Sequence, residues 1–220
     1  VEMADPVIEL NSESENIKTK QDDYEEREYT IKNYDRNMIS DSFSDLFAYK
    51  SVIYDENGKL LSVAPPKSIG YNYFTSSYDC DSNIEISEII EGTMINLFYH
   101  NDKWMLSTRG AIGGTYFYFR NQYYVDVHST TRQISFYDMF MEALQADDNQ
   151  MLNDNMLMKN MEKNYYYSFV IQHHDNSIVI NVRFPQLYLG VGYKVDSIEN
   201  NKLTSINEEI YEKCDGFKTR

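Results

Sequence analysis

A tight polar turn between two short apolar segments constrains this fold more than any other feature of the sequence. The run Asp55-Glu56-Asn57-Gly58 separates residues 49–54 from residues 60–64. Asn-Gly between apolar runs is the strongest short-range signal for a β-hairpin. Pro65 and Pro66 then end the second strand, because proline has no N–H to donate to a sheet. The sequence therefore predicts an antiparallel pair of strands here.

Further strands are predicted where apolar and polar residues alternate or where aromatic residues gather. Two more hairpins are expected, residues 94–99 with 104–108 around His100-Asn101-Asp102, and residues 165–172 with 178–182 around a polar turn at 173–177. Residues 84–90 and 187–194 are expected to be single strands.

Helices are predicted in two or three places. Residues 135–146 place apolar side chains at helical spacing, with Ser135 as the N-cap and Asp138 three positions later. Residues 153–161 form a second, methionine-rich candidate, and residues 206–211 a short third one. Hairpins interrupted by a few helices predict an α+β fold with antiparallel sheets.

The charge balance excludes one broad class of function. The 220 residues carry 35 acidic against 20 basic side chains, for a formal net charge of −15. A free-standing basic nucleic-acid module is excluded, because phosphate binding needs a Lys/Arg surface that displaces counterions. Any nucleic-acid role must therefore depend on a local patch.

The first forty residues hold eleven of the acids and only five bases. With few large apolar residues, residues 1–40 are expected to be a solvated acidic arm or a loose helix, or else a docking segment for a basic partner. The strand-rich domain is expected at 41–196, and a polar C-terminal segment at 197–220.

Cysteine usage and hydropathy indicate an intracellular protein. Cys80 and Cys214 make neither a disulfide framework nor a zinc spacing, so two reduced thiols are expected. No stretch of 18 apolar residues is present, and the N-terminus lacks the features of a secretory signal. The expected location is the cytoplasm or, as an alternative, a virion.

Familiar catalytic motifs are absent from the sequence. There is no phosphate-binding Gly-x-x-x-x-Gly-Lys loop, no Gly-x-Gly-x-x-Gly, no His-Glu-x-x-His and no Gly-x-Ser-x-Gly. His173-His174-Asp175 offers metal-ligand atoms, but it lies at an expected turn with no third ligand cluster nearby. A surface turn is therefore favoured there over a metal site.

The segment from residue 49 to 114 carries the most specific pattern. A hairpin ends in Pro65-Pro66-Lys67, the run Glu91-Gly92-Thr93 follows, and a second hairpin ends in Thr108-Arg109-Gly110. This order resembles the adenylation domain of the phage-type RNA ligases, the T-even phage group of the covalent nucleotidyltransferases. Within that family the chain is most similar to divergent ligase-like proteins of large nucleocytoplasmic DNA viruses. The resemblance covers about 150 residues and includes Asp175-Asn176-Ser177 as the later strand–Asn–strand motif.

The resemblance implies a set of nucleotide-binding residues. Lys67 and Arg109 match basic positions that face phosphates in the family, and Glu91, Gly92 and Thr93 match the end of its Lys-x-Asp-Gly-Ser/Thr motif. ATP and Mg²⁺ are the cofactors that an active member would use. The sequence would be the same if Lys67 and Arg109 were ordinary surface charges at the ends of hairpins, so the alternative remains open.

The family's nucleophile is missing at the matching position. The lysine that attacks the ATP α-phosphate is replaced by Ile89, which cannot form the bond. Lys213, in Lys213-Cys214-Asp215-Gly216, matches the motif letter for letter but has only seven residues after it, and Lys67-Ser68-Ile69-Gly70 is a third candidate. The family's final Glu-Gly and Lys-x-Lys motifs are not found.

Three functions remain open. The first is an active ATP-dependent RNA ligase. The second, which we favour, is a ligase-fold pseudoenzyme that binds a nucleotide or an RNA end. The third is a virion-associated structural or assembly protein that uses its acidic arm or a surface rich in its 20 tyrosines to bind protein partners.

Overall fold

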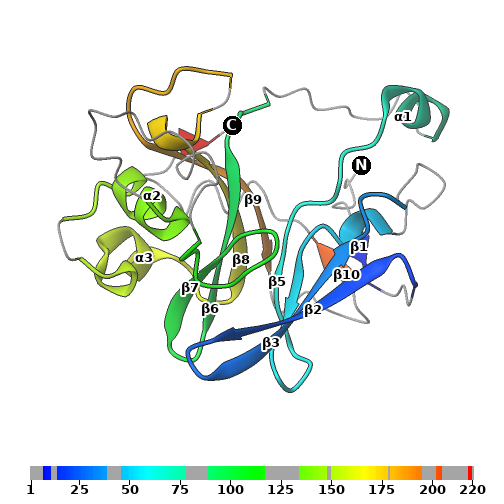
Figure 1. Cartoon of the computed structure of the whole chain (residues 1–220), viewed down its shortest axis with the longest axis horizontal. Helices are drawn as coiled ribbons and strands as arrows, with labels where there is room; N and C mark the ends of the chain where they lie inside the picture. The colour runs from blue at the N-terminus through cyan, green and yellow to red at the C-terminus, as the bar shows by residue number, and fades with distance from the viewer. Residues whose placement is uncertain are drawn as a thin grey trace, which may run out of the picture.

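The structure, a computed structural model, describes residues 7–10, 14–38, 46–77, 89–116, 134–147, 150–177, 179–194, 202–204 and 218–219. Its secondary structure consists of antiparallel sheets and a few short helices (Figure 1). The expected α+β class with antiparallel sheets is confirmed. In the described part of the chain, no helix is long and apolar enough to cross a membrane.

A four-stranded antiparallel sheet contains the first half of the described chain, in the order β2-β3-β4-β5. Its strands are β2 (Ile17–Tyr24), β3 (Arg27–Tyr34), β4 (Val52–Tyr54) and β5 (Leu60–Val63). A separate pair joins β1 (Val7–Glu9) to β10 (Lys202–Thr204).

A five-stranded sheet has the order β11-β9-β8-β6-β7. Its strands are β6 (Thr93–His100), β7 (Lys103–Ser107), β8 (Tyr165–Gln172), β9 (Gln186–Lys194) and β11 (Lys218–Thr219). All pairs are antiparallel except β11 with β9. The helices are α1 (Tyr71–Ser77), α2 (Phe136–Ala143) and α3 (Met156–Asn160), with 3₁₀ turns η3 (Leu152–Asp154) and η4 (His174–Asn176).

One face of the five-stranded sheet is covered by α2 and α3 (Figure 1). Alternate residues of β8 point to this face, because successive side chains of a strand lie on opposite sides. Phe169 packs edge-on against Phe140 of α2, with 5.8 Å between ring centroids. Trp104 of β7 donates its indole N–H to the carbonyl of Met158 in α3. These contacts form the first of two apolar cores.

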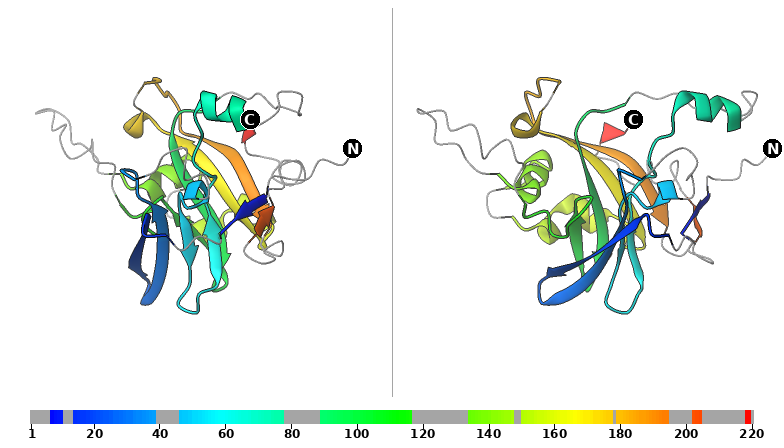
Figure 2. Two further views of the ribbon diagram at one scale, coloured as in Figure 1. Left: turned by 90° about the vertical axis from the view of Figure 1, so that its right-hand side faces the viewer. Right: turned by 45° about the vertical axis from the view of Figure 1, so that its right-hand side comes forward.

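The opposite face of the same sheet packs against the four-stranded sheet. The second core joins Phe98, Met105 and Tyr166 to Ile31 and Ile53, all of them buried. The hydroxyl of Tyr166 donates to the carbonyl of Leu60 at 2.8 Å and so links β8 to β5. The molecule therefore has three layers, which the two views of Figure 2 show from other sides.

The turns at 55–58 and 100–102 are confirmed as hairpin connections. Gly58 has φ of 78°, as a tight turn with glycine requires. Asn101 and Asp102 have φ of 50° and 59°, the pair of positive values that a type I′ hairpin turn needs. The helix predicted at 135–146 is also confirmed, and Ser135 with Asp138 makes a capping box at its start. The second predicted helix corresponds to η3 and α3.

The expected acidic arm is wrong for residues 14–38. These residues form β2 and β3, which pair with each other and, through β3, with β4. In β3 the buried side chains Tyr29 and Ile31 alternate with charged or polar ones. Apart from the buried Asp22, the acids of this segment lie on its solvated face or in its turns, so its overall composition concealed a regular strand pattern.

The third predicted hairpin is wrong in its second strand. The strand that pairs with β8 is β9, and residues 179–182 lie outside any strand. The N–H groups of Val179 and Ile180 donate to the carboxylate of Glu91 instead of to a neighbouring strand. The strand expected at 187–194 is confirmed as part of β9. Of the strand expected at 84–90, residues 84–88 lie outside the described residues, as does the helix expected at 206–211.

Candidate functional site

Except for Lys213, which lies outside the described residues, the site residues named from the sequence lie at the end of the sheets where β6 starts and β7 finishes. There they form three separate groups rather than one pocket. Glu91, Gly92 and Thr93 contact β8 and the segment after it. Lys67 contacts Phe47, and Arg109 contacts Tyr34.

Glu91 and Thr93 hold the segment that follows β8. The two carboxylate oxygens of Glu91 accept from the N–H groups of Val179 and Ile180, each at 2.8 Å. The Thr93 hydroxyl oxygen accepts from the Asn176 amide at 3.0 Å. The two motifs that the sequence singled out, around residue 92 and around residue 176, are therefore neighbours. Their contacts fix a loop, and both Glu91 oxygens are already used in this way.

Gly92 is required by the close approach of β8. A Cβ atom at this position would lie 2.3 Å from the carbonyl oxygen of Ile171 and 2.7 Å from a methyl carbon of Val170. No side chain fits such a gap. The glycine of the motif thus allows the chain to enter β6 directly against its neighbour strand.

The three positions considered for a lysine nucleophile are found in different surroundings. Ile89 is 87% exposed and offers no nucleophilic atom. Lys213 and the cysteine next to it lie outside the described residues. Lys67 places its ammonium 5.1 Å from the centre of the Phe47 ring and donates to the carbonyl of Ser68.

Arg109 is fixed by more contacts than Lys67, the other basic candidate. Its guanidinium carbon lies 4.5 Å from the centre of the Tyr34 ring. Its Nε donates to the carbonyl of Lys50 at 3.0 Å, and its Nη2 to the carbonyl of Tyr34 at 3.4 Å. A stacked guanidinium anchored at two nitrogens loses little conformational freedom when it binds a ligand.

A surface hollow of about 390 Å³ opens beside this guanidinium. We call it the Arg109 hollow, and it is lined by Lys18, Tyr34, Asp35, Arg36 and Arg109 with the neighbouring Asn33, Asn37 and Gly110. Three of these side chains are cationic and one is anionic. In a chain of net charge −15, such a local excess of positive charge is the patch that an anionic ligand would need.

Burial, and to a lesser extent neighbouring cations, lower the pKa values of Arg109 in the hollow and of Lys50 beside it. Burial lowers the pKa of the Lys50 ammonium from its usual 10.5, and the charge of Arg109 acts in the same direction. Burial also lowers the pKa of Arg109. An anion placed between such groups would relieve the repulsion between them.

The single carboxylate that lines the hollow, Asp35, already has two hydrogen-bond partners. Asp35 pairs with Lys18 at 2.9 Å and accepts from the N–H of Asn37 at 3.0 Å. The hydrogen bond from Lys18 lowers the pKa of this carboxyl. With only this carboxylate in its lining, the hollow does not supply a protein ligand set for Mg²⁺.

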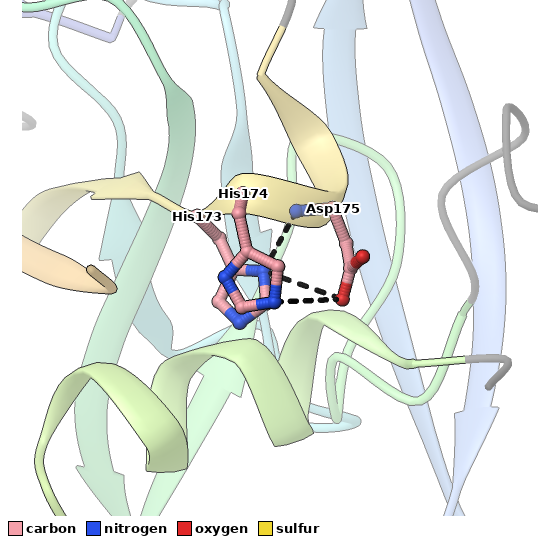
Figure 3. A group of neighbouring side chains, drawn as sticks. All are labelled: His173, His174 and Asp175. Atoms are coloured by element: carbon pink, nitrogen blue, oxygen red, sulfur yellow. Dashed lines mark hydrogen bonds and ion pairs between the residues drawn. The ribbon is translucent and has the colours of Figure 1, made fainter. Parts of the chain in front are cut away.

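The pair His173 and His174 forms a stacked arrangement beside Asp175 (Figure 3). His173 is fully buried, which corrects the expectation of a surface turn for this residue, whereas the side chain of His174 is half exposed. The Nδ1 of His173 accepts from the N–H of Asp175 at 3.1 Å, so its Nε2 carries the proton and donates to Glu142 at 3.0 Å. The Nδ1 of His173 thus caps η4, and its Nε2 holds this turn onto α2.

Lys18, Tyr34 and Arg36 were not identified from the sequence. They lie in the segment interpreted as an arm. They meet Arg109 because β3 pairs with β4 and because Lys50, two residues before β4, accepts a hydrogen bond from Arg109. The alternation of Tyr29 and Ile31 with polar residues was the available signal that residues 27–34 form a strand.

No protein-family model matches this sequence, and no curated protein matches it either.

Proposed function

We propose that the protein is an RNA-ligase-like nucleotide-binding domain that binds the phosphate of a nucleotide or an RNA end in the Arg109 hollow without forming a lysine adduct. The observation that carries this proposal is the convergence of Arg109, Arg36 and Lys18 around one hollow of an otherwise acidic protein. Cations in fixed positions are what phosphate recognition requires.

The contacts of Arg109 support a phosphate ligand in particular. Its Nε and Nη2 are taken by backbone carbonyls, and among the described residues Nη1 makes no hydrogen bond. An oxyanion that enters the hollow would meet Nη1 together with the ammonium of Lys18 and the guanidinium of Arg36. Charge-assisted hydrogen bonds of this kind are about twice as strong as neutral ones.

The order of the elements supports the ligase-like part of the proposal. The hairpin β4–β5, the glycine turn before β6 and the hairpin β6–β7 ending near Arg109 follow one another as the resemblance implies. The exposed Ile89 at the nucleophile position supports binding without covalent catalysis, because its side chain carries no group that can attack phosphorus.

Incubation with radiolabelled ATP and Mg²⁺ tests the two halves of the proposal separately. We expect no labelled protein on a denaturing gel, and non-covalent ATP binding in equilibrium dialysis. Arg109→Gln should weaken that binding roughly tenfold, the value of one charge-assisted contact.

Lys67→Gln is the matched control, because Lys67 lies on Phe47 and does not line the hollow. It removes the same charge and should change ATP affinity less than about twofold. An adduct that Lys213→Ala abolishes would contradict the pseudoenzyme interpretation. Equal losses in the Lys67 and Arg109 variants would contradict the assignment of the hollow.

A further inference from the structure

Three hairpin turns meet at the end of the molecule away from the Arg109 hollow, at the lower edge of Figure 1. They are the β2–β3 turn, the β4–β5 turn and the β6–β7 turn. Arg27 at the first turn pairs with Glu56 at the second, and Lys103 at the third pairs with Glu25 at the first. Residues from the three hairpins are thus in direct contact.

Asp55, Glu56 and His100 form a cluster of metal-ligand type at this meeting point. One carboxylate oxygen of each acid and one ring nitrogen of His100 all lie within 4.8 Å of one another. At ligand distances of about 2.0–2.2 Å, two donors of one ion lie at most about 4.4 Å apart, so a small movement of the side chains would bring these three donors onto one ion. Two of the donors come from the β4–β5 turn and one from the end of β6.

The imidazole of His100 provides an independent sign of a ligand at this cluster. Its Nε2 is buried and has no hydrogen-bond partner among the described residues. A buried polar atom without a partner costs free energy, and coordination of a metal ion would offset that cost.

The surroundings of the cluster are strongly acidic. A hollow of about 470 Å³ adjoins Glu56 and is lined by Glu25, Glu26, Arg27, Glu28 and Glu56. Four carboxylates against one guanidinium attract a cation and provide an open path from solvent. Asp55 is fixed because its Oδ1 accepts from the N–H groups of Asn57 and Lys59, at 2.9 Å and 2.8 Å.

We propose that Asp55, Glu56 and His100 bind a divalent first-row transition-metal ion that holds the β4–β5 turn to the end of β6. One imidazole with two carboxylates suits Mn²⁺, Fe²⁺ or Zn²⁺, and the imidazole disfavours Mg²⁺ and Ca²⁺. Arg27 competes for Glu56, since its Nη1 lies 3.0 Å from the Glu56 carboxylate. Metal binding would exchange that exposed ion pair for coordination.

Electron paramagnetic resonance of Mn²⁺ titrated into the full chain tests this site, because bound Mn²⁺ loses its free-ion signal and thiols compete weakly for it. We expect one saturable site that excess Mg²⁺ does not empty. Glu56→Gln should weaken binding roughly tenfold or more, as is usual when a ligand or its support is lost. His100→Phe keeps a ring against Tyr29 and should abolish the preference for Mn²⁺ over Mg²⁺.

Glu28→Gln is the matched control for charge. It removes the same charge from the same hollow but leaves the three donors intact, so binding should change less than about threefold. Arg27→Gln should strengthen binding, because Glu56 then has no competing cation. His174→Asn should have no effect.

Three results would overturn the proposal. These are the absence of a saturable Mn²⁺ site, equal effects of Glu28→Gln and Glu56→Gln, and loss of binding in His174→Asn with retention in His100→Phe. Glu56 is exposed, so its substitution leaves the core intact. If the His100 variant fails to fold, the comparison of Glu56→Gln with Glu28→Gln still tests the metal site. ATP binding does not enter any of these outcomes, and the two proposals fail independently.

Discussion

Arg109 illustrates what a single residue position can and cannot reveal before a structure exists. The sequence places it at the end of a hairpin, where it is either a phosphate ligand or an ordinary surface charge. The structure shows a guanidinium stacked on Tyr34 and bonded to the carbonyl of Lys50. Both partners are far from Arg109 in the sequence, so no local pattern could indicate the contacts that fix it.

Glu91 shows the opposite outcome. Its place in a ligase-like motif implies a role in shaping a nucleotide pocket, but its two oxygens bind the backbone of Val179 and Ile180. The residue type was sufficient to identify a functional-looking turn. It was not sufficient to distinguish a nucleotide pocket from a carboxylate that binds the backbone of a loop, because both arrangements need an acid beside a glycine.

Tyr54 gives a prediction about pH at the residue scale. Burial raises the pKa of its hydroxyl from 10.0 to about 12. The unfolded chain ionises this tyrosine at lower pH than the folded protein does, so its contribution is fully present below pH 10 and is lost as the pH rises to 12. Tyr54→Phe should therefore lose less stability than the wild type between pH 9 and pH 12.

Urea unfolding at pH 9, 10, 11 and 12 measures this difference. Tyr71→Phe is the control, since Tyr71 is 79% exposed and should leave the pH dependence of the wild type unchanged. Parallel pH profiles for the wild type and Tyr54→Phe would show that Tyr54 does not contribute to alkaline unfolding.

At the scale of elements, local hairpins could be predicted and distant pairing could not. The β4–β5 and β6–β7 hairpins follow from turn residues such as Asn57 and Gly58, whose conformational preferences are local. The pairing of β8 with β6 and β9 depends on contacts across as many as 78 residues, from Thr93 to Ile171, and leaves no local signature. The segment 179–182 was misassigned for the same reason, since its partner is a side chain 88 residues away.

Gly92→Ala tests the close contact that starts β6. The new methyl group would overlap the carbonyl of Ile171, so we expect a loss of about 1–3 kcal/mol in the free energy of unfolding. Gly110→Ala is the matched control, because nothing lies within 4 Å of its Cβ position. Urea unfolding followed by the fluorescence of the single tryptophan, Trp104, measures both variants. Equal stability of the two would contradict the proposed packing of β6 on β8.

At the scale of the whole molecule, the net charge of −15 is unevenly distributed. The acidic hollow of Glu25, Glu26, Glu28 and Glu56 lies at the start of β3, and the Arg109 hollow adjoins Tyr34 at the end of the same strand. Seven residue steps of a strand separate the two ends by about 23 Å. The composition excluded a basic nucleic-acid module but could not reveal this separation, which depends on the register of β2, β3 and β4.

The distance between the two hollows bears on RNA binding. If the Arg109 hollow binds phosphate as proposed, the acidic remainder of the molecule should repel most of a polynucleotide, and only a terminal phosphate should reach the hollow. The interaction is therefore expected to be strongest at low ionic strength and to depend on the end of the RNA rather than on its length.

Fluorescence anisotropy of a short RNA with either a 5′-phosphate or a 5′-hydroxyl decides whether the Arg109 hollow binds a terminal phosphate. We expect the wild-type protein to bind the phosphorylated RNA roughly tenfold more tightly at low salt, as one additional charge-assisted contact allows. Arg109→Gln should bind both RNAs equally and weakly, whereas Lys67→Gln should retain the preference. Equal binding of the two RNAs by the wild type, or a preference that survives in Arg109→Gln, would contradict a phosphate site in this hollow.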